Sequence, residues 1–154
     1  MSKIPARAWR RAWWIVPGVI TALIIGFAVS IPIVNDSVAR DVEMRLLDLP
    51  LPAGAERIDS MSQAGRIVGN GNGMQYFGAL LIRSEDSADE LQRFYTDHQE
   101  AIELAITVTP AQELQDFHGA HGFLGRVGEQ GTFVVQAEGH APGGVFENAD
   151  LRGH

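Results

Sequence analysis

The sequence of 154 residues contains no cysteine. This absence excludes disulfide bonds, catalytic thiolates, cysteine-ligated zinc and iron–sulfur clusters. It also excludes the bacterial lipoprotein anchor, which is attached through a cysteine. A domain of this chain that faces an oxidising compartment is therefore held together by packing and hydrogen bonds, without covalent cross-links.

Basic residues are also scarce, with 12 Lys and Arg against 19 Asp and Glu and a net charge of −7. A nucleic-acid-binding protein needs clustered Lys and Arg to neutralise phosphates, so nucleic acid is not an expected partner. The length suits one domain, since domains typically contain roughly 100–200 residues. The charges are distributed unevenly along the chain, and this distribution indicates where the protein resides.

Residues 12–34 form a stretch of 23 residues without any charge, AWWIVPGVITALIIGFAVSIPIV. A helix of this length rises about 34 Å, which is enough to cross a hydrocarbon core of about 30 Å. Its prolines and glycines are tolerated in membrane helices, and Trp13 and Trp14 lie at one end, where indole rings favour the lipid headgroups. The sequence therefore predicts a transmembrane helix over residues 12–34, with the lipid bilayer as a partner.

The charges that flank this stretch predict its orientation. All 19 acidic residues follow it, whereas four basic residues precede it: Lys3, Arg7, Arg10 and Arg11. The positive-inside rule then places residues 1–11 in the cytoplasm as a basic tail, and residues 35–154 outside the cytoplasmic membrane. The outer part carries a net charge of −11, which predicts that it stands off anionic lipid.

A cleaved signal peptide is the alternative to a retained anchor. Residues 28–30 (Ala-Val-Ser) and 37–39 (Ser-Val-Ala) resemble the small-residue sites at which signal peptides are cut. The apolar stretch is longer than the apolar core of about 7–15 residues that is typical of signal peptides. Its length favours the retained anchor.

Residues 35–52 are interpreted as a juxtamembrane helix followed by a proline-containing linker. Apolar residues recur at helical spacing over residues 36–49, at Val38, Val42, Leu46 and Leu49. The segment Leu-Pro-Leu-Pro then ends the helix, because proline cannot continue it. This helix either extends the membrane helix as a stalk or pairs with a second copy of the chain.

Residues 53–140 are expected to form an extracytoplasmic domain, followed by a flexible tail over residues 141–154. Residues 55–67 predict one irregular strand or two short ones. Residues 74–82 (MQYFGALLI) are apolar on both alternating faces, which is typical of a central strand. Residues 103–109 alternate as a half-buried strand, and residues 132–136 predict the second strand of a hairpin with residues 123–127.

A soluble helix is predicted over residues 84–99. Ser87 and Glu90 match the capping box, and the acidic residues around them suit the positive end of a helix dipole better than a calcium loop. A second, short helix is predicted from Thr109 as cap and Pro110 as first residue through Phe117. The predicted fold class is therefore α+β: one N-terminal transmembrane helix, then a small antiparallel sheet with one or two helices packed on it.

The most conspicuous motif alternates glycine and asparagine at residues 69–73. Both residue types adopt positive φ easily, so the backbone N–H groups can converge on an anion. The same composition is typical of a hairpin turn, and it matches neither a dinucleotide fingerprint nor a phosphate loop. A turn is the favoured interpretation. The alternative is a ligand-binding site formed by Gly69, Asn70, Gly71, Asn72 and Gly73.

His118 and His121 have a spacing that is typical of metal ligands. A metal site needs a further ligand, from His98, His140 or a carboxylate, and no His-Glu-x-x-His motif is present. Solvated loop histidines are therefore the favoured interpretation, and His98 is expected to be a hydrogen-bonded residue at the edge of a helix. No catalytic residue and no cofactor are predicted.

Residues 65–95 resemble a group of small bacterial membrane-anchored proteins. Proteins of this group carry a similar Gly-Asn-Gly-Asn-Gly-Met stretch, an apolar strand that ends in a basic residue and serine, and a helix of the Ser-x-Glu-Glu-Leu type that ends in tyrosine. The matching positions here are residues 69–74, 83–84 and 87–95. The resemblance implies that this part is a recurring module, and it assigns no activity.

These features predict a single-pass membrane protein that presents a small domain outside the cell membrane and acts by binding, as an accessory module of the bacterial envelope. Its partner would be another envelope protein, a second copy or a small ligand. One alternative is a metal-dependent extracytoplasmic enzyme that uses His118 and His121. Another is a structural homo-oligomer that associates through the span and residues 38–49. The lack of a catalytic constellation favours binding.

Overall fold

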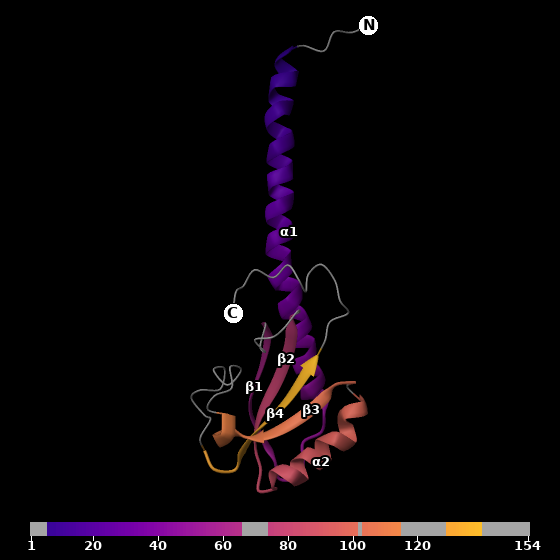
Figure 1. Cartoon of the computed structure of the whole chain (residues 1–154), viewed down its shortest axis with the longest axis vertical. Coiled ribbons are helices and arrows are strands. Elements are labelled where there is room, and N and C mark those ends of the chain that lie inside the picture. Colours follow the sequence, from indigo (N-terminus) through magenta and orange to yellow (C-terminus); the bar gives the residue numbers. More distant parts are fainter. Residues whose placement is uncertain (1–5, 66–73, 102, 115–128, 140–154) are drawn as a thin grey trace.

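The computed structural model describes residues 6–65, 74–101, 103–114 and 129–139. One long helix stands above a small sheet, and a second helix lies at the far end of the sheet (Figure 1). This arrangement confirms the predicted α+β class. The elements in chain order are α1 (Ala6–Asp48), β1 (Glu56–Gly65), β2 (Gln75–Arg83), α2 (Ala88–His98), η1 (Gln99–Ala101), β3 (Ala105–Pro110), η2 (Ala111–Leu114) and β4 (Thr132–Gly139).

The four strands form one antiparallel sheet in the order β1-β2-β4-β3. β2 is an interior strand whose residues from Tyr76 to Ile82 are all buried, which confirms the predicted central strand. β1 is a single strand with a shift of register between Arg57 and Asp59, which confirms the predicted irregularity. β3 buries Ile106 and Val108 and exposes Thr107 between them, as the predicted alternation requires.

The predicted hairpin between residues 123–127 and β4 is wrong, because β4 has other partners on both edges. β4 hydrogen-bonds to β2 along one edge and to β3 along the other, so neither edge is left for residues 123–127. Those residues lie outside the described part of the chain. The predicted short helix is also displaced, because Pro110 ends β3 and the described turn is the 3-10 helix Ala111–Leu114.

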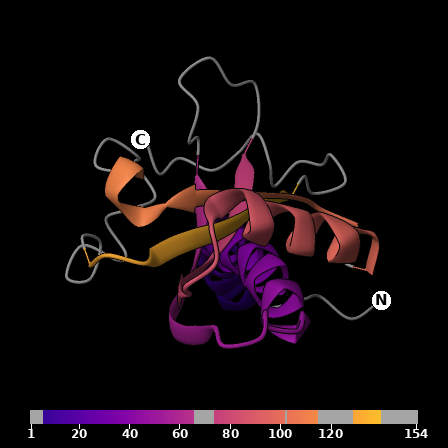
Figure 2. The same cartoon turned by 90° about the horizontal axis from the view of Figure 1, so that it is seen from below.

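Helices cover one face of the sheet, and η2 packs against the other. On the first face, the C-terminal half of α1 and the apolar side of α2 form one core with alternate residues of the sheet: Ala39, Val42, Leu46, Tyr76, Leu80, Leu91, Tyr95, Val108 and Val135. On the second face, η2 contributes Ala111 and Leu114 to a smaller cluster with Phe77, Ala79, Leu81 and Val134. Figure 2 shows α1 on one side of the sheet and η2 on the other.

The juxtamembrane helix extends the membrane helix, as one alternative predicted, but it packs on the sheet and is not a free stalk. The helix is continuous over 43 residues and ends at Asp48, just before the Leu-Pro-Leu-Pro segment. Val42 and Leu46 are 4% and 0% exposed, because they pack on the sheet of their own chain. The apolar stripe of residues 38–49 therefore belongs to the core of the domain and is not free to pair with a second copy.

A glycine sets how closely α1 approaches the sheet. A Cβ atom on Gly78 would lie 2.7 Å from the backbone nitrogen of Glu43 and 2.9 Å from its Cα atom. Real Cβ atoms do not come so close to backbone atoms, so any larger residue would push the helix away from β2. Gly78 thus lets the backbone of α1 lie directly on the central strand.

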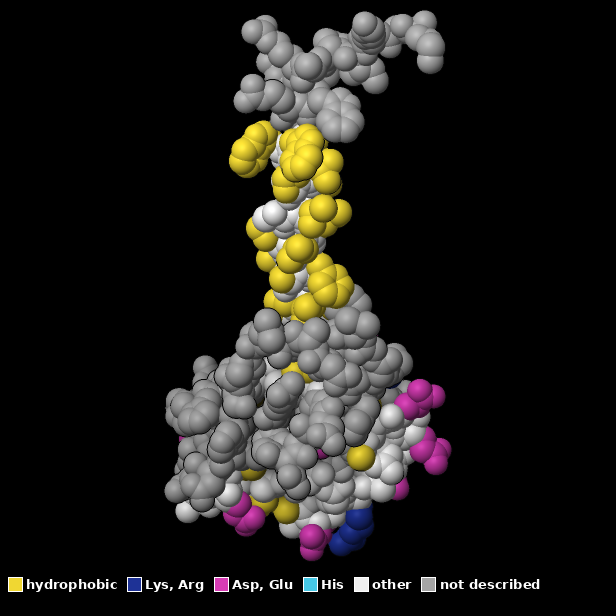
Figure 3. Space-filling view, turned by 45° about the horizontal axis from the view of Figure 1, so that its top comes forward, with side chains coloured by type: hydrophobic (Ala, Val, Ile, Leu, Met, Phe, Trp, Pro, Cys, Tyr) yellow, Lys and Arg dark blue, Asp and Glu magenta, His cyan; other side chains and the backbone are white. Residues whose placement is uncertain are grey.

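The N-terminal half of α1 packs on nothing in the described part of the chain. Every residue from 13 to 29 is exposed, and large apolar side chains cover this segment (Figure 3). Within the described residues, α1 is the one helix that is long and apolar enough to cross a membrane. Isolated apolar side chains are common on protein surfaces, whereas here they cover the exposed segment continuously.

Candidate functional site

An open cleft of about 880 Å³ lies at the end of the sheet remote from the free half of α1. Its volume falls in the range of roughly 300–1,000 Å³ that is usual for small-ligand sites. The segment before β1, the end of β2 and the turn before β4 contribute to its walls. The described lining residues are Ala53, Gly54, Glu56, Arg83, Ser84, Glu85, Asp86, Gln130, Gly131 and Phe133.

Two glycines with positive φ shape the rim of the cleft. Gly54 has a φ of 82° in a turn that the hydrogen bond from Ala55 N–H to Pro52 O closes at 3.1 Å. Gly131 has a φ of 75°, and a Cβ atom there would lie 3.2 Å from the carbonyl oxygen of Ser84. L-residues with a side chain rarely adopt these φ values, so both turns require glycine.

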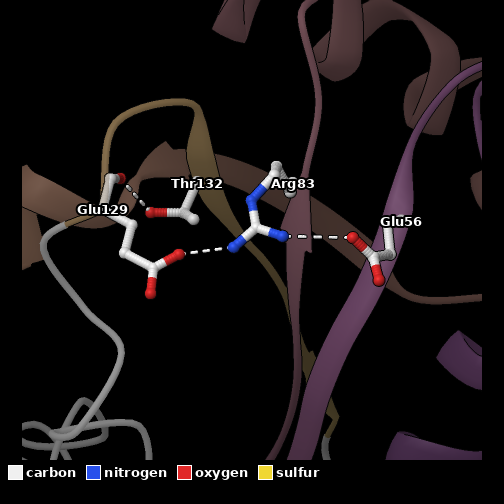
Figure 4. A network of polar contacts seen from close by, with 4 residues as sticks. All are labelled: Glu56, Arg83, Glu129 and Thr132. Carbon is white, nitrogen blue, oxygen red and sulfur yellow. Dashed lines mark hydrogen bonds and ion pairs between the residues drawn. The ribbon is translucent and has the colours of Figure 1, made fainter.

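Arg83 joins two elements that flank the cleft (Figure 4). One Nη atom donates to Glu56 Oε2 on β1 at 3.1 Å, and the other donates to the carboxylate of Glu129. The Glu129 carboxylate, with a smaller effect of Glu56, raises the pKa of Arg83 above its ordinary value. All three side chains are largely exposed, so water and salt screen these ion pairs.

The buried side of the same turn is held by backbone and hydroxyl groups. Thr132, only 3% exposed, donates its hydroxyl to the carbonyl oxygen of Glu129 at 2.6 Å. Ser84 N–H donates to Gly131 O at 3.0 Å, which joins the end of β2 to the turn before β4. These bonds hold in place the backbone segments that carry the side chains of Arg83 and Glu129.

Ser84 and Asp86 form the other wall. The Ser84 hydroxyl donates to Asp86 Oδ2 at 3.1 Å and accepts from Asp86 N–H at 3.1 Å. Among the described lining residues, this pair has no histidine beside it, which is the usual base for a serine nucleophile. Its evident role is to turn the chain from β2 towards α2.

The electrostatics of the cleft favour cations. Its described lining carries the carboxylates of Glu56, Glu85 and Asp86 against the single guanidinium of Arg83. The apolar contribution comes from Ala53 and the half-buried Phe133. This combination suits non-covalent binding of a small or extended group that carries positive charge.

The predicted glycine–asparagine site falls outside the described residues, as Gly69–Gly73 are not among them. The strands on either side are described. β1 and β2 are consecutive antiparallel neighbours, with Gly65 opposite Gln75 in the register. This pairing is what the turn interpretation requires, and both the turn and the ligand-binding alternative stay predictions.

The predicted metal ligands His118 and His121, and also His140, lie outside the described residues. His98 is described: its Nδ1 atom lies 2.7 Å from the carbonyl oxygen of Phe94, and its ring lies 4.6 Å from the Phe94 ring. This confirms His98 as a hydrogen-bonded residue at the edge of α2. Among the described residues, no group of three or more His, Asp or Glu is placed to hold a metal ion.

Asp89 and Glu90 lie in the first turn of α2, as predicted, whereas Glu85 and Asp86 precede the cap and line the cleft. Ser87 Oγ accepts from Glu90 N–H at 3.3 Å, and Glu90 Oε2 accepts from Ser87 N–H at 2.9 Å. The bonds from Ser87 lower the pKa of Glu90. This capping box fixes the start of α2 at Ala88, two residues after Asp86, the last lining residue of this wall.

Comparisons with protein-family models, with curated proteins and with solved structures found no match. The ion pairs of Arg83 with Glu56 and Glu129 were not anticipated from the sequence, because these three residues are far apart along the chain. Only the strand register brings them together, with Glu56 opposite Arg83 and Arg83 opposite Thr132. The one local signal was the basic residue at the end of the apolar strand.

Proposed function

We propose that this protein is a single-pass membrane protein of the bacterial envelope, with its N-terminus in the cytoplasm and its α+β domain outside. The domain acts by binding, through the cleft lined by Arg83 and its neighbouring carboxylates. The observation that carries this proposal is the course of α1, which is apolar and exposed over residues 13–29 and then enters the core of the domain. The basic residues before the span support the orientation.

The packing of α1 also supports a retained anchor. Asn35 and Ala39 are 0% and 1% exposed within the domain. Cleavage after Ala39 would remove both residues from the core and leave buried partners without contacts. The chain is therefore expected not to be cleaved after Ala39. Mass spectrometry of the protein extracted from membranes is expected to find the full-length chain.

The experiment on binding uses the full chain in detergent-solubilised membranes. Cross-linking followed by affinity purification is expected to recover a specific partner from the wild type. Glu85→Lys, which reverses a charge at the cleft, is expected to lose it. Glu100→Lys is the matched control, because Glu100 is equally exposed but lies on η1, away from the cleft lining.

Two results would argue against this proposal. The first is recovery of no specific partner, together with no shift of the melting temperature by cationic peptides or polyamines. The second is equal recovery by the two charge-reversed variants, which would place binding elsewhere on the domain. A C-terminal reporter that is active in the cytoplasm would contradict the orientation.

A further inference from the structure

The part of α1 that is needed to cross a bilayer extends to the part that packs in the folded domain. Residues 13–29 are exposed throughout, and they would rise about 26 Å as a helix. A hydrocarbon core of about 30 Å needs about 20 residues, so a core that begins at Trp13 ends near residue 33. Asn35, however, lies only two residues further along α1, and it is already fully buried and hydrogen-bonded to Tyr76 of the sheet. No free linker separates the bilayer from the domain.

The contact of α1 with the start of β2 is polar. Asn35, which is fully buried, accepts a hydrogen bond of 2.9 Å from the hydroxyl of Tyr76 near the start of β2. The end of the sheet formed by Gly65, Gln75 and Gly139 therefore lies beside the point where α1 leaves the apolar span. The cleft lies beyond Arg83, about 23 Å further along β2.

We infer that the sheet end at Gly65, Gln75 and Gly139 is seated in the lipid headgroup layer, so that the bilayer surface is a partner of the domain itself. This inference rests on the proposed membrane anchoring. It replaces the expectation from net charge that the domain stands off the membrane. The carboxylates of the cleft, Glu56, Glu85 and Asp86, lie at the opposite end, so seating the domain brings none of them to the lipid.

This position of the sheet end fixes the distance of the cleft from the bilayer and the side to which the cleft opens. α1 is helical without a break from the span into the core, and it is held on the sheet by the Tyr76–Asn35 bond and by the close contact at Gly78. The cleft consequently faces away from the bilayer, where it meets soluble molecules or the outer parts of neighbouring membrane proteins.

The absence of cysteine makes this inference directly testable with single-cysteine variants of the full chain. In nanodiscs of phosphatidylethanolamine and phosphatidylglycerol, Gln75→Cys and Gln130→Cys each receive a fluorophore. Lipids with a nitroxide on the headgroup are expected to quench the fluorophore at position 75 several-fold more than the one at position 130. Gln63→Cys, on β1 near the same end, is a second reporter if the variant at position 75 unfolds.

A second measurement separates the seating from the anchoring. Ile33 and Met44 are 63% and 55% exposed on α1, so Ile33→Cys and Met44→Cys should react alike with a water-soluble maleimide in the absence of lipid. In nanodiscs, Ile33→Cys is expected to react at least several-fold more slowly. Equal reaction rates at both positions in nanodiscs would contradict the proposed membrane anchoring. Protection of position 33 with equal quenching at positions 75 and 130 would overturn the seating alone.

Discussion

The hydroxyl of Tyr76 donates a hydrogen bond of 2.9 Å to the amide oxygen of Asn35, between residues 41 positions apart in the chain. Both side chains are almost completely buried. The bond connects the central strand to α1 at the point where this helix enters the domain. A buried polar pair of this kind favours one arrangement of helix and sheet, because displacement of either element leaves polar atoms without partners.

Two buried tyrosines provide a matched pair of stability tests. Tyr76 has its hydroxyl bonded to Asn35, whereas the hydroxyl of Tyr95 has no hydrogen-bond partner in the described part of the chain. Tyr76→Phe is expected to lower the free energy of unfolding by about 1 kcal/mol, because it removes one bond. Tyr95→Phe should be neutral or stabilising. Denaturant unfolding in detergent measures both, and an equal loss in the two variants would contradict the assignment.

The ionisation of Tyr95 predicts a loss of stability in alkali. Burial raises the pKa of Tyr95 to about 12, from an ordinary value of 10.0. Above pH 10 the unfolded chain releases this proton while the folded chain retains it, so stability falls as the pH rises towards 12. The fall approaches about 1.4 kcal/mol per pH unit at most. The free energy of unfolding, measured from about pH 9 to about pH 11, should fall more steeply for the wild type than for Tyr95→Phe.

Gly78→Ala is expected to destabilise the domain by about 1–3 kcal/mol, as is usual for overpacking in a core. The added methyl group would meet the backbone of Glu43, which cannot move without displacing α1. Gly139→Ala should cost less, because its nearest neighbour is a methyl group of the Val42 side chain. Gly26→Ala is the control, since no atom lies within 4 Å of the added Cβ. Thermal melting of the three variants in detergent gives the order.

Gln92 protects the outer edge of β3. Its side-chain amide donates to Ile106 O at 3.0 Å and accepts from Val108 N–H at 2.8 Å, as a neighbouring strand would. Edge strands with free backbone groups pair with other chains, and β3 carries no charged residue. Gln92→Ala should therefore lower the melting temperature and increase aggregation on heating. Gln112→Ala, an exposed residue of η2, should do neither; equal light scattering by the two variants would refute this role.

The cap of α2 predicts a loss of stability that depends on pH. Ser87→Ala removes the hydroxyl that accepts from Glu90 N–H, which typically costs about 1 kcal/mol. Because the bonds from Ser87 lower the pKa of Glu90, their contribution is present above the ordinary pKa of 4.5 and is lost as the pH falls through the lowered value. Wild type and Ser87→Ala should thus converge in stability in acid. A difference that stays constant from neutral to acidic pH would exclude this coupling.

Local signals in the sequence predicted several elements correctly. The apolar stretch predicted a membrane-length helix, and the unbroken apolar residues of 74–82 predicted the central strand. Ser87 and Glu90 predicted the start of α2, because a capping box acts between residues three positions apart. In each case the forces involved act within one turn or one strand, so the sequence alone contains the pattern.

The partners of these elements could not be predicted in the same way. The stripe of Val42 and Leu46 looks the same whether it faces a second helix or a sheet, and only the tertiary structure shows that it covers β2. The insertion of β4 between β2 and β3 likewise joins segments that are distant in the chain. The sequence by itself determined where the chain is apolar, which segment forms the central strand and where α2 is capped. Only long-range packing decided that the span continues into the core, and only strand register assembled the cleft around Arg83.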